Sequence, residues 1–239
     1  MTKGELIMND RKLKTNLDTD FIKIIAVVSM TIDHIGGAFF PQYPAFRWIG
    51  RIAFPLFCYC LTVGMMYTGD IKKYLFRLGA FAVISQPFWI LAFNSDDIIG
   101  NIFNLNIFFT LIVSLLGACG FKERKWWLFI LALILLNVIN FDYAMTGLIL
   151  ILIFYLCRNK PWLGAAVYTL TYLPALNGNM ADPLALKIGG HAIGFEIFAL
   201  LALPFIYMQT NSGLKIPKWF FYIYYPAHLF AIYLIGILF

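Results

Sequence analysis

Residues 21–40 read FIKIIAVVSMTIDHIGGAFF, an apolar run that is interrupted by Lys23, Asp33 and His34. A membrane-spanning helix needs about 20 consecutive apolar residues, which is the length of this run. Ionisable side chains inside such a helix are costly and usually serve a function. The stretch therefore predicts a membrane helix that carries a polar site.

The composition of the whole chain agrees with this interpretation. Of its 239 residues, 62% are hydrophobic and 13% are charged, whereas soluble domains have about half and a quarter. The mean hydropathy of +0.80 also excludes a disordered chain, which would be polar and highly charged. We expect a short cytoplasmic segment, residues 1–20, followed by a single transmembrane domain, residues 21–239.

The apolar runs predict an all-α, polytopic membrane bundle of about nine helices, with a range of about eight to ten. The expected helices cover residues 21–40, 51–68, 73–93, 103–120, 126–141, 143–157, 162–177, 191–209 and 219–238. The count is least defined at residues 126–157, where only residues 141–143 separate two short runs.

Basic residues alternate between the two ends of these expected helices, and cytoplasmic loops carry an excess of Lys and Arg. The basic residues that fall on one side are Lys3, Arg11, Lys12, Lys14, Lys72, Lys73, Arg77, Lys122, Arg124, Lys125, Arg158, Lys160, Lys215 and Lys218. The opposite connections mix Arg47, Arg51 and Lys187 with acidic residues, and Phe239 ends the chain without a basic flank. The pattern predicts a cytoplasmic N-terminus and an external C-terminus, and it argues against a nucleic-acid partner despite the net charge of +6.

The first helix holds the main candidate site. Lys23 and His34 are eleven residues apart, which places both on one helical face, about 16 Å apart along the axis. Asp33 is a candidate to orient a neighbouring imidazole, as the acid does in a catalytic triad. The alternative for His34 is a histidine that is merely hydrogen-bonded inside the bundle.

Arg47 and Arg51 are four residues apart and share a helical face if the second helix begins early. The neighbouring Trp48 favours anchoring at the lipid interface. The alternative is an anion clamp that pairs with phosphate or stabilises a developing oxyanion.

Other polar residues inside apolar runs have both a structural and a functional interpretation. Interhelical hydrogen bonds explain Gln86 and Asn104, and packing explains His228 and the aromatic Tyr225 before it. All four remain candidate binding residues. The sequence predicts no metal site, because the three histidines are far apart and no carboxylate–histidine spacing gathers ligands.

Several motifs together resemble the TraX family, which is named for the conjugal pilus acetylation protein. They begin with MTIDHIG at residues 30–36 and GRIAFPLF at residues 50–57. The others are KYLFRL at residues 73–78, SQP at residues 85–87 and KWFFYIYYPAHL at residues 218–229. The resemblance covers nearly the whole chain, from about residue 20 to residue 235.

The TraX family is similar to the wider superfamily of transmembrane acyltransferases. In its acyltransferase-3 proteins, a basic residue precedes an essential first-helix histidine by eleven positions, and Lys23 with His34 resembles that pair. A second signature, two arginines on a later helix, is matched only approximately, because Arg47 and Arg51 are one residue too widely spaced.

The resemblance implies a multi-pass enzyme of the bacterial cell membrane that uses cytoplasmic acetyl-CoA. The acceptor is an amine or hydroxyl, as in the amino-terminal acetylation of pilin, and a peptide amine, a glycan and a small molecule all fit. In this hypothesis Lys72, Lys73, Arg77 and Lys23 hold the nucleotide, His34 with Asp33 is the general base, and Arg51 with Arg47 stabilises the oxyanion. Direct transfer and an acetyl-histidine relay both fit these residues.

Two other functions use the same residues. A small-solute or proton-coupled transporter also places polar groups within its helices. An assembly subunit of the cell envelope would use its intramembrane charges to bind a partner helix. Binding of coenzyme A separates the enzyme from both.

Overall fold

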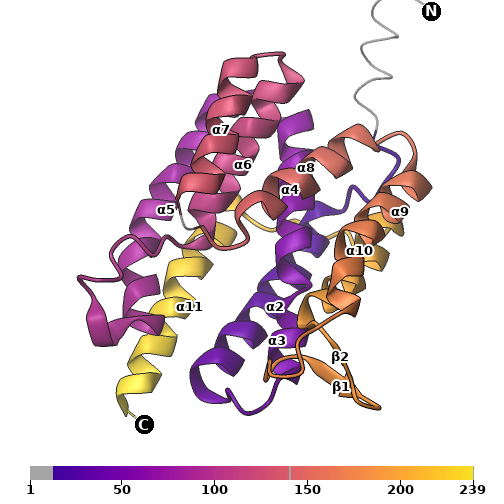
Figure 1. Cartoon of the computed structure of the whole chain (residues 1–239). Helices are drawn as coiled ribbons and strands as arrows, with labels where there is room; N and C mark the ends of the chain where they lie inside the picture. The colour runs from indigo at the N-terminus through magenta and orange to yellow at the C-terminus, as the bar shows by residue number, and fades with distance from the viewer. Residues whose placement is uncertain (1–12, 140, 239) are drawn as a thin grey trace, which may run out of the picture.

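The computed structural model describes residues 13–139 and 141–238 (Figure 1). Lys3, Arg11, Lys12 and Phe239, which entered the topology prediction, lie outside the described residues, as does most of the expected segment 1–20. The helices are α2 Thr19–Phe39, α3 Ala45–Gly50, α4 Ala53–Tyr67, α5 Ile71–Phe93, η1 Ser95–Asp97, α6 Ile107–Lys122, α7 Trp126–Val138, α8 Ala144–Leu156, α9 Pro161–Tyr172, η2 Leu173–Leu176, η3 Phe195–Ala202, α10 Leu203–Tyr207 and α11 Lys218–Leu238. The strands are β1 Leu186–Ile188 and β2 His191–Ile193.

The described chain is mostly helical, as the sequence predicts, and four of its spans are long and apolar enough to cross a membrane. These spans are α2, the nearly continuous pair α3–α4, α5 and α11. The helices α6, α7 and α8 and the segment Phe195–Tyr207 are apolar but shorter. The second span begins at Ala45, six residues before the expected start at residue 51, so it includes both Arg47 and Arg51.

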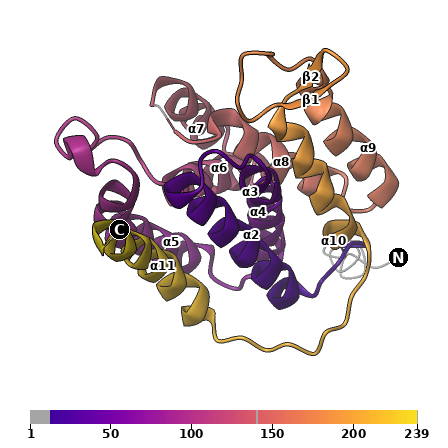
Figure 2. The same ribbon diagram turned by 90° about the horizontal axis from the view of Figure 1, so that it is seen from below.

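The long helices surround a core centred on α4, in which twelve of fifteen residues are buried. Helix α2 packs against α3 and α4, and α11 packs against both α5 and α2. Seen from below, α11 lies beside α5 and α2, although α11 is the last helix of the described chain and α2 the first (Figure 2). Helices α6, α7 and α8 form a second group that contacts α4 through α6 and α8.

Local sequence determines where several helices begin and end. The side chain of Asp18 caps α2 by accepting a hydrogen bond from the backbone N–H of Phe21. Asn106 caps α6 in the same way, which explains why this helix begins at Ile107 and not at the expected residue 103. Helix α9 ends at Tyr172 because Pro174 follows, and a shorter 3-10 turn completes the run expected to extend to residue 177.

The helix predicted over residues 191–209 is confirmed only for Phe195–Tyr207, because the residues before it form a hairpin. Residues 186–193 form an antiparallel hairpin in which Ile188 pairs with His191. Gly189 and Gly190 make its turn with positive φ angles of 56° and 79°, a conformation that suits two consecutive glycines. Helical structure resumes only at Phe195, so the exposed His191 belongs to a strand and does not begin a helix.

The two ends of the bundle carry different connections. The turns after α4, α6 and α8 lie at one end, where Lys122, Arg124, Lys125, Arg158 and Lys160 are found (Figure 1). The opposite end holds the turn between α2 and α3, the hairpin and the end of α11 (Figure 1). This arrangement agrees with the alternation of basic residues in the sequence.

Candidate functional site

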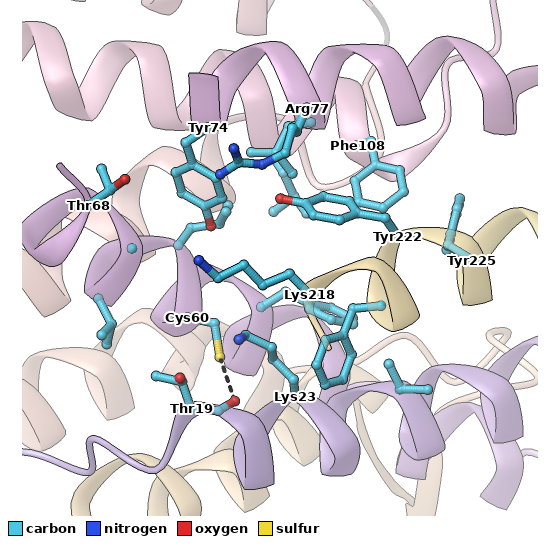
Figure 3. A pocket seen from close by; sticks show the side chains of 18 of the residues that line it. Thr19, Lys23, Cys60, Thr68, Tyr74, Arg77, Phe108, Lys218, Tyr222 and Tyr225 are labelled. Carbon is cyan, nitrogen blue, oxygen red and sulfur yellow. Dashed lines mark hydrogen bonds between the residues drawn. The ribbon is translucent and has the colours of Figure 1, made fainter. Parts of the chain in front are cut away.

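A cavity of about 340 Å³ lies among α2, α4, α5, α6 and α11 (Figure 3). We call it the cationic cavity, because the described residues that line it include Lys23, Arg77 and Lys218 but no acidic residue. Three different helices supply these basic groups, and the side chains of Lys23 and Lys218 point into the cavity (Figure 3). The site is thus electropositive on one side and suits an anionic group.

The basic side chains differ in how they are held. Lys23 pairs with Asp20 at 3.1 Å, and its ammonium lies 5.1 Å from the centre of the Phe221 ring. The guanidinium of Arg77 lies 5.9 Å from the centre of the Tyr74 ring, and its Nε is buried without a hydrogen-bond partner among the described residues. Burying a charged donor in this way is costly, which favours a ligand that accepts from it.

Aromatic and apolar side chains line the rest of the cationic cavity. They include Tyr222 and Tyr225 of α11, Phe108 of α6 and Met30 of α2. The lining of the cavity therefore changes from basic to apolar along α2, from Lys23 to Met30.

One turn beyond Met30, the imidazoles of His34 and His228 contact each other. His34 Nδ1 lies 2.8 Å from His228 Nε2, and the two ring planes are within 10° of parallel. His228 Nδ1 lies 3.0 Å from the carbonyl oxygen of Tyr224. Both histidines are buried, with exposed fractions of 9% and 7%. A hydrogen bond across 194 residues of sequence thus joins α2 to α11.

Aromatic rings surround this pair and connect it to the cationic cavity. The ring of His34 lies 5.2 Å from Phe93, 6.0 Å from Trp89 and 6.4 Å from Tyr225, measured between centroids. Tyr225 also lines the cationic cavity, so its ring lies next to both the cavity and the imidazole pair. The surroundings of the pair are apolar and largely closed to water.

A second, apolar cavity lies farther along α2 and α11, and His228 lines it. Its volume is about 550 Å³, and we call it the apolar groove. Side chains of α2 and α11 and the neighbouring Phe40 form it: Thr31, Ile35, Phe39, Phe40, His228, Ala231, Ile232 and Ile235. His228 thus lines the apolar groove directly, whereas the ring of Tyr225 joins the imidazole pair to the cationic cavity.

Asp33 pairs with two arginines and not with an imidazole. Its Oδ2 lies 2.7 Å from Arg47 Nη1, and its Oδ1 lies 3.0 Å from Arg51 Nη2. Arg51 Nε also donates to the carbonyl oxygen of Arg47 at 3.3 Å. The side chains of Asp33 and Arg51 are only 11% and 10% exposed. This ion cluster fixes α2 to α3 and to the start of α4, in place of the expected orientation of His34 by Asp33.

The ion cluster also reaches the elements that follow in sequence. The guanidinium of Arg51 lies 4.9 Å from the ring centre of Phe195 and 5.4 Å from that of Tyr143. Burial raises the pKa of Asp142, in the turn before α8, and the positive charges of Arg51 and Arg47 partly oppose this shift. Arg51 is therefore surrounded by protein groups, and neither it nor Arg47 lines the cationic cavity.

Two glycines allow α2 and α3 to approach closely enough for the ion cluster to form. A Cβ at Gly50 would overlap the carboxylate of Asp33, and a Cβ at Gly36 would overlap the side chain of Phe46. Small residues at such crossings let helices pack backbone to backbone. The glycines in the motifs at residues 30–36 and 50–57 are explained by this contact.

The Gly50→Ala variant should unfold more easily than wild type, because the added methyl group displaces Asp33 from its arginines. Overpacking of this kind costs about 1–3 kcal/mol. Gly79→Ala is the matched control, since nothing lies within 4 Å of a Cβ at this position of α5; this change should stabilise the helix by about 0.5–1 kcal/mol. Thermal unfolding in detergent measures both, and equal melting temperatures would contradict the predicted close contact.

The other candidate residues fall in different places. Lys72 and Lys73 are exposed and do not line the cationic cavity, and Lys73 pairs with Asp70 at 3.5 Å. Gln86 Nε2 donates to the backbone oxygen of Asn104 at 2.9 Å, which joins α5 to the segment before α6. Gln86 and Asn104 therefore have the structural role of a hydrogen bond between two segments. The candidate residues that the structure brings together are Lys23, Arg77, Tyr225, His34 and His228.

Sequence reasoning missed Lys218 as a site residue, because it counted this lysine only as a topology signal. Its spacing contained the information: Lys218, Tyr222 and Tyr225 follow at i, i+4 and i+7, which is one face of a helix. All three line the cationic cavity.

These features define a helical membrane protein with a polar site buried between its long helices. The profile of the TraX protein family matches residues 18–236, so the chain belongs to that family. The structure shows where the motifs of the family resemblance lie, since MTIDHIG and GRIAFPLF meet at the ion cluster and KWFFYIYYPAHL supplies Lys218 and His228.

Two relatives extend this result. The probable fimbrial assembly protein FimC, serogroup H1, of Dichelobacter nodosus is 29% identical over 230 residues, which cover 87% of this chain and 91% of that protein. Uncharacterized protein RP591 of Rickettsia prowazekii (strain Madrid E) is 52% identical over 46 residues, which cover 19% of this chain and 18% of that protein. No solved structure matches the chain significantly.

Proposed function

We propose that this protein is a multi-pass membrane acetyltransferase that transfers an acetyl group from cytoplasmic acetyl-CoA to an amine or hydroxyl. The observation that carries the proposal is the buried imidazole pair beside the cationic cavity, with Tyr225 in contact with both. A proton-accepting side chain next to a site for a polyanionic donor is what acyl transfer from coenzyme A needs.

The cationic cavity suits the donor. Its basic groups, Lys23, Arg77 and Lys218, would bind the phosphates, since charge-assisted hydrogen bonds to phosphate are strong. The apolar part suits a thin pantetheine arm. Lys23 and His34 are about 16 Å apart along α2, a distance that an extended arm covers.

The apolar groove offers a separate approach for the acceptor. It includes His228 and lies farther along α2 and α11 than the cationic cavity. The relative from Dichelobacter nodosus is named for fimbrial assembly, which supports a fimbrial or pilin subunit as the acceptor of this protein. The alternation of basic residues supports a cytoplasmic position for the N-terminal end of α2 and an inner-membrane location.

The chemistry assigns His34 the role of general base. Its imidazole takes a proton from the acceptor amine or hydroxyl as the acceptor nitrogen or oxygen attacks the thioester carbonyl carbon. The carbon–sulfur bond breaks, and the thiolate of coenzyme A leaves and receives the proton from the imidazolium. A relay through acetyl-histidine would divide this step into two.

The ion cluster has a supporting role in this proposal. Because Asp33 engages both Arg47 and Arg51, neither guanidinium is free to hold the oxyanion in this arrangement. The cluster instead holds the end of α2 that carries His34, which preserves the position of the imidazole.

The first experiment is a titration of the purified, detergent-solubilised protein with acetyl-CoA, followed by measurement of acetate release. Wild type should bind acetyl-CoA, and Lys218→Gln should bind it about tenfold more weakly, because one charge-assisted contact to phosphate is lost. Lys187→Gln, which changes an exposed lysine of the hairpin, is the matched control and should bind like wild type.

Two results would count against the proposal. Wild type without affinity for acetyl-CoA would reject it and favour a transporter, which has no reason to bind this molecule. Equal affinities of wild type and Lys218→Gln would show that the donor binds outside the cationic cavity.

A further inference from the structure

Hydrogen bonds determine which nitrogens of the imidazole pair carry protons. A carbonyl oxygen can only accept, so His228 Nδ1, which lies 3.0 Å from the oxygen of Tyr224, carries a hydrogen and donates it. In a neutral imidazole the other nitrogen is then an acceptor. His228 Nε2 therefore accepts from His34 Nδ1 at 2.8 Å, and His34 Nε2 is left with its lone pair.

This assignment requires that both rings are neutral, and their surroundings favour that state. Both histidines are buried, and the groups that face His34 from α5 and α11 are the uncharged Trp89, Phe93 and Tyr225. The charged side chains nearby are Asp33, Arg47 and Arg51 of the ion cluster and Asp142 in the turn before α8. Among the described residues no carboxylate forms an ion pair with either imidazole, and the charges that act on His34 are the guanidinium groups of Arg47 and Arg51, which oppose a further positive charge.

We infer that His228 is a positioning residue that holds His34 in the Nδ1–H tautomer, so that Nε2 of His34 is the atom that accepts the proton. The consequence for catalysis rests on the proposed function. It goes beyond that function by naming Nε2 of His34 as the reactive nitrogen and His228 as the imidazole that sets its tautomer. His228 also continues to accept from Nδ1–H when His34 becomes an imidazolium, which lowers the cost of that charge.

A spectroscopic experiment tests the tautomer without any activity. The full-length protein is labelled with ¹⁵N-histidine in detergent micelles, and His34→Gln and His228→Gln assign the signals of a chain that contains three histidines. We expect His34 to show a protonated Nδ1 and an unprotonated Nε2, and a scalar coupling to connect Nδ1 of His34 with Nε2 of His228. An Nε2–H tautomer at His34 would overturn the inference.

Two substitutions of His228 separate positioning from packing. His228→Gln keeps a side-chain oxygen that can accept from His34 Nδ1, whereas His228→Phe keeps the aromatic ring that stacks on Tyr224 and His34 but has no acceptor. Positioning predicts that the Phe variant loses about 10²-fold in kcat, the lower end of the range for proton-transfer catalysis, and that the Gln variant recovers most of it. Affinity for acetyl-CoA should stay unchanged in both variants.

The possible results test the role of His228 and the proposed function separately. If packing is the role of His228, the order is reversed and Phe is the milder change, which overturns the inference. If wild type shows the expected tautomer but no acetyl transfer, the assignment of the protons stands and the proposed function fails.

Discussion

The His34→Ala variant should bind acetyl-CoA with the affinity of wild type and lose about 10³-fold in kcat for acetyl transfer, because it lacks the general base. Binding is preserved because the basic groups of the cationic cavity lie one or more turns away along α2 or on other helices. Acetate or acetylated acceptor, measured at saturating acetyl-CoA, gives kcat, and a titration gives the affinity.

His191→Ala is the matched control for this experiment. His191 is exposed on β2, and its Nε2 contacts the carbonyl oxygen of Leu176 at 2.8 Å, far in sequence from the imidazole pair. This variant should retain full activity. If His34→Ala retains activity too, a different residue removes the proton, and the role of His34 is structural.

The second large effect concerns stability. Asp33→Asn removes the carboxylate that pairs with Arg47 and Arg51 and leaves two guanidinium groups, one of them buried, without their partner. Breaking a buried ion pair by removing one side costs about 3–5 kcal/mol. For a chain of this length, such a loss lowers the melting temperature by about 10 °C. Thermal unfolding in detergent, followed by intrinsic fluorescence, measures the difference.

Asp70→Asn is the control for the loss of a carboxylate. Asp70 pairs with the exposed Lys73 and caps α5, and Asn caps helices as well as Asp does. This change should therefore leave the melting temperature almost unchanged. A double variant with Asp33→Asn and Arg51→Met should be less destabilised than the sum of the two single changes, because each removes the same interaction. Additive losses would show that Asp33 and Arg51 act independently.

Local sequence was a good guide to the helices and to one half of the site. The run at residues 21–40 predicted α2, and its ionisable residues marked the end of α2 where His34 lies. Helical periodicity and apolar length are properties of consecutive residues, so they can be recognised without a structure. The spacing of Arg47 and Arg51 was interpretable for the same reason, since both lie within one short segment.

The pairing of groups that are distant in sequence could not be predicted from local pattern. Nothing near His228 in the sequence indicates that its partner is His34, 194 residues away. A single histidine among aromatic rings is more often a packed core residue than a catalytic one, so the sequence favours packing for His228. Asp33 was assigned to an imidazole because the two are neighbours in sequence. Adjacent residues of a helix point in different directions, and the carboxylate instead reaches the arginines of α3 and the following turn.

The hairpin was missed because its strands are only three residues long and are followed by an apolar stretch of helical length. The Gly189–Gly190 turn was the available signal, since both residues need positive φ angles in a tight two-residue turn.

The contact between α2 and α11 also affects biogenesis. A ribosome adds about 5–20 residues per second, so about 10–40 seconds separate the synthesis of His34 from that of His228. During this interval the nascent chain has neither the second imidazole nor the wall of the cationic cavity that carries Lys218. The site therefore comes into existence only when the last of the long helices has entered the membrane, and a defect in that final insertion step would remove the imidazole partner and the cavity wall together.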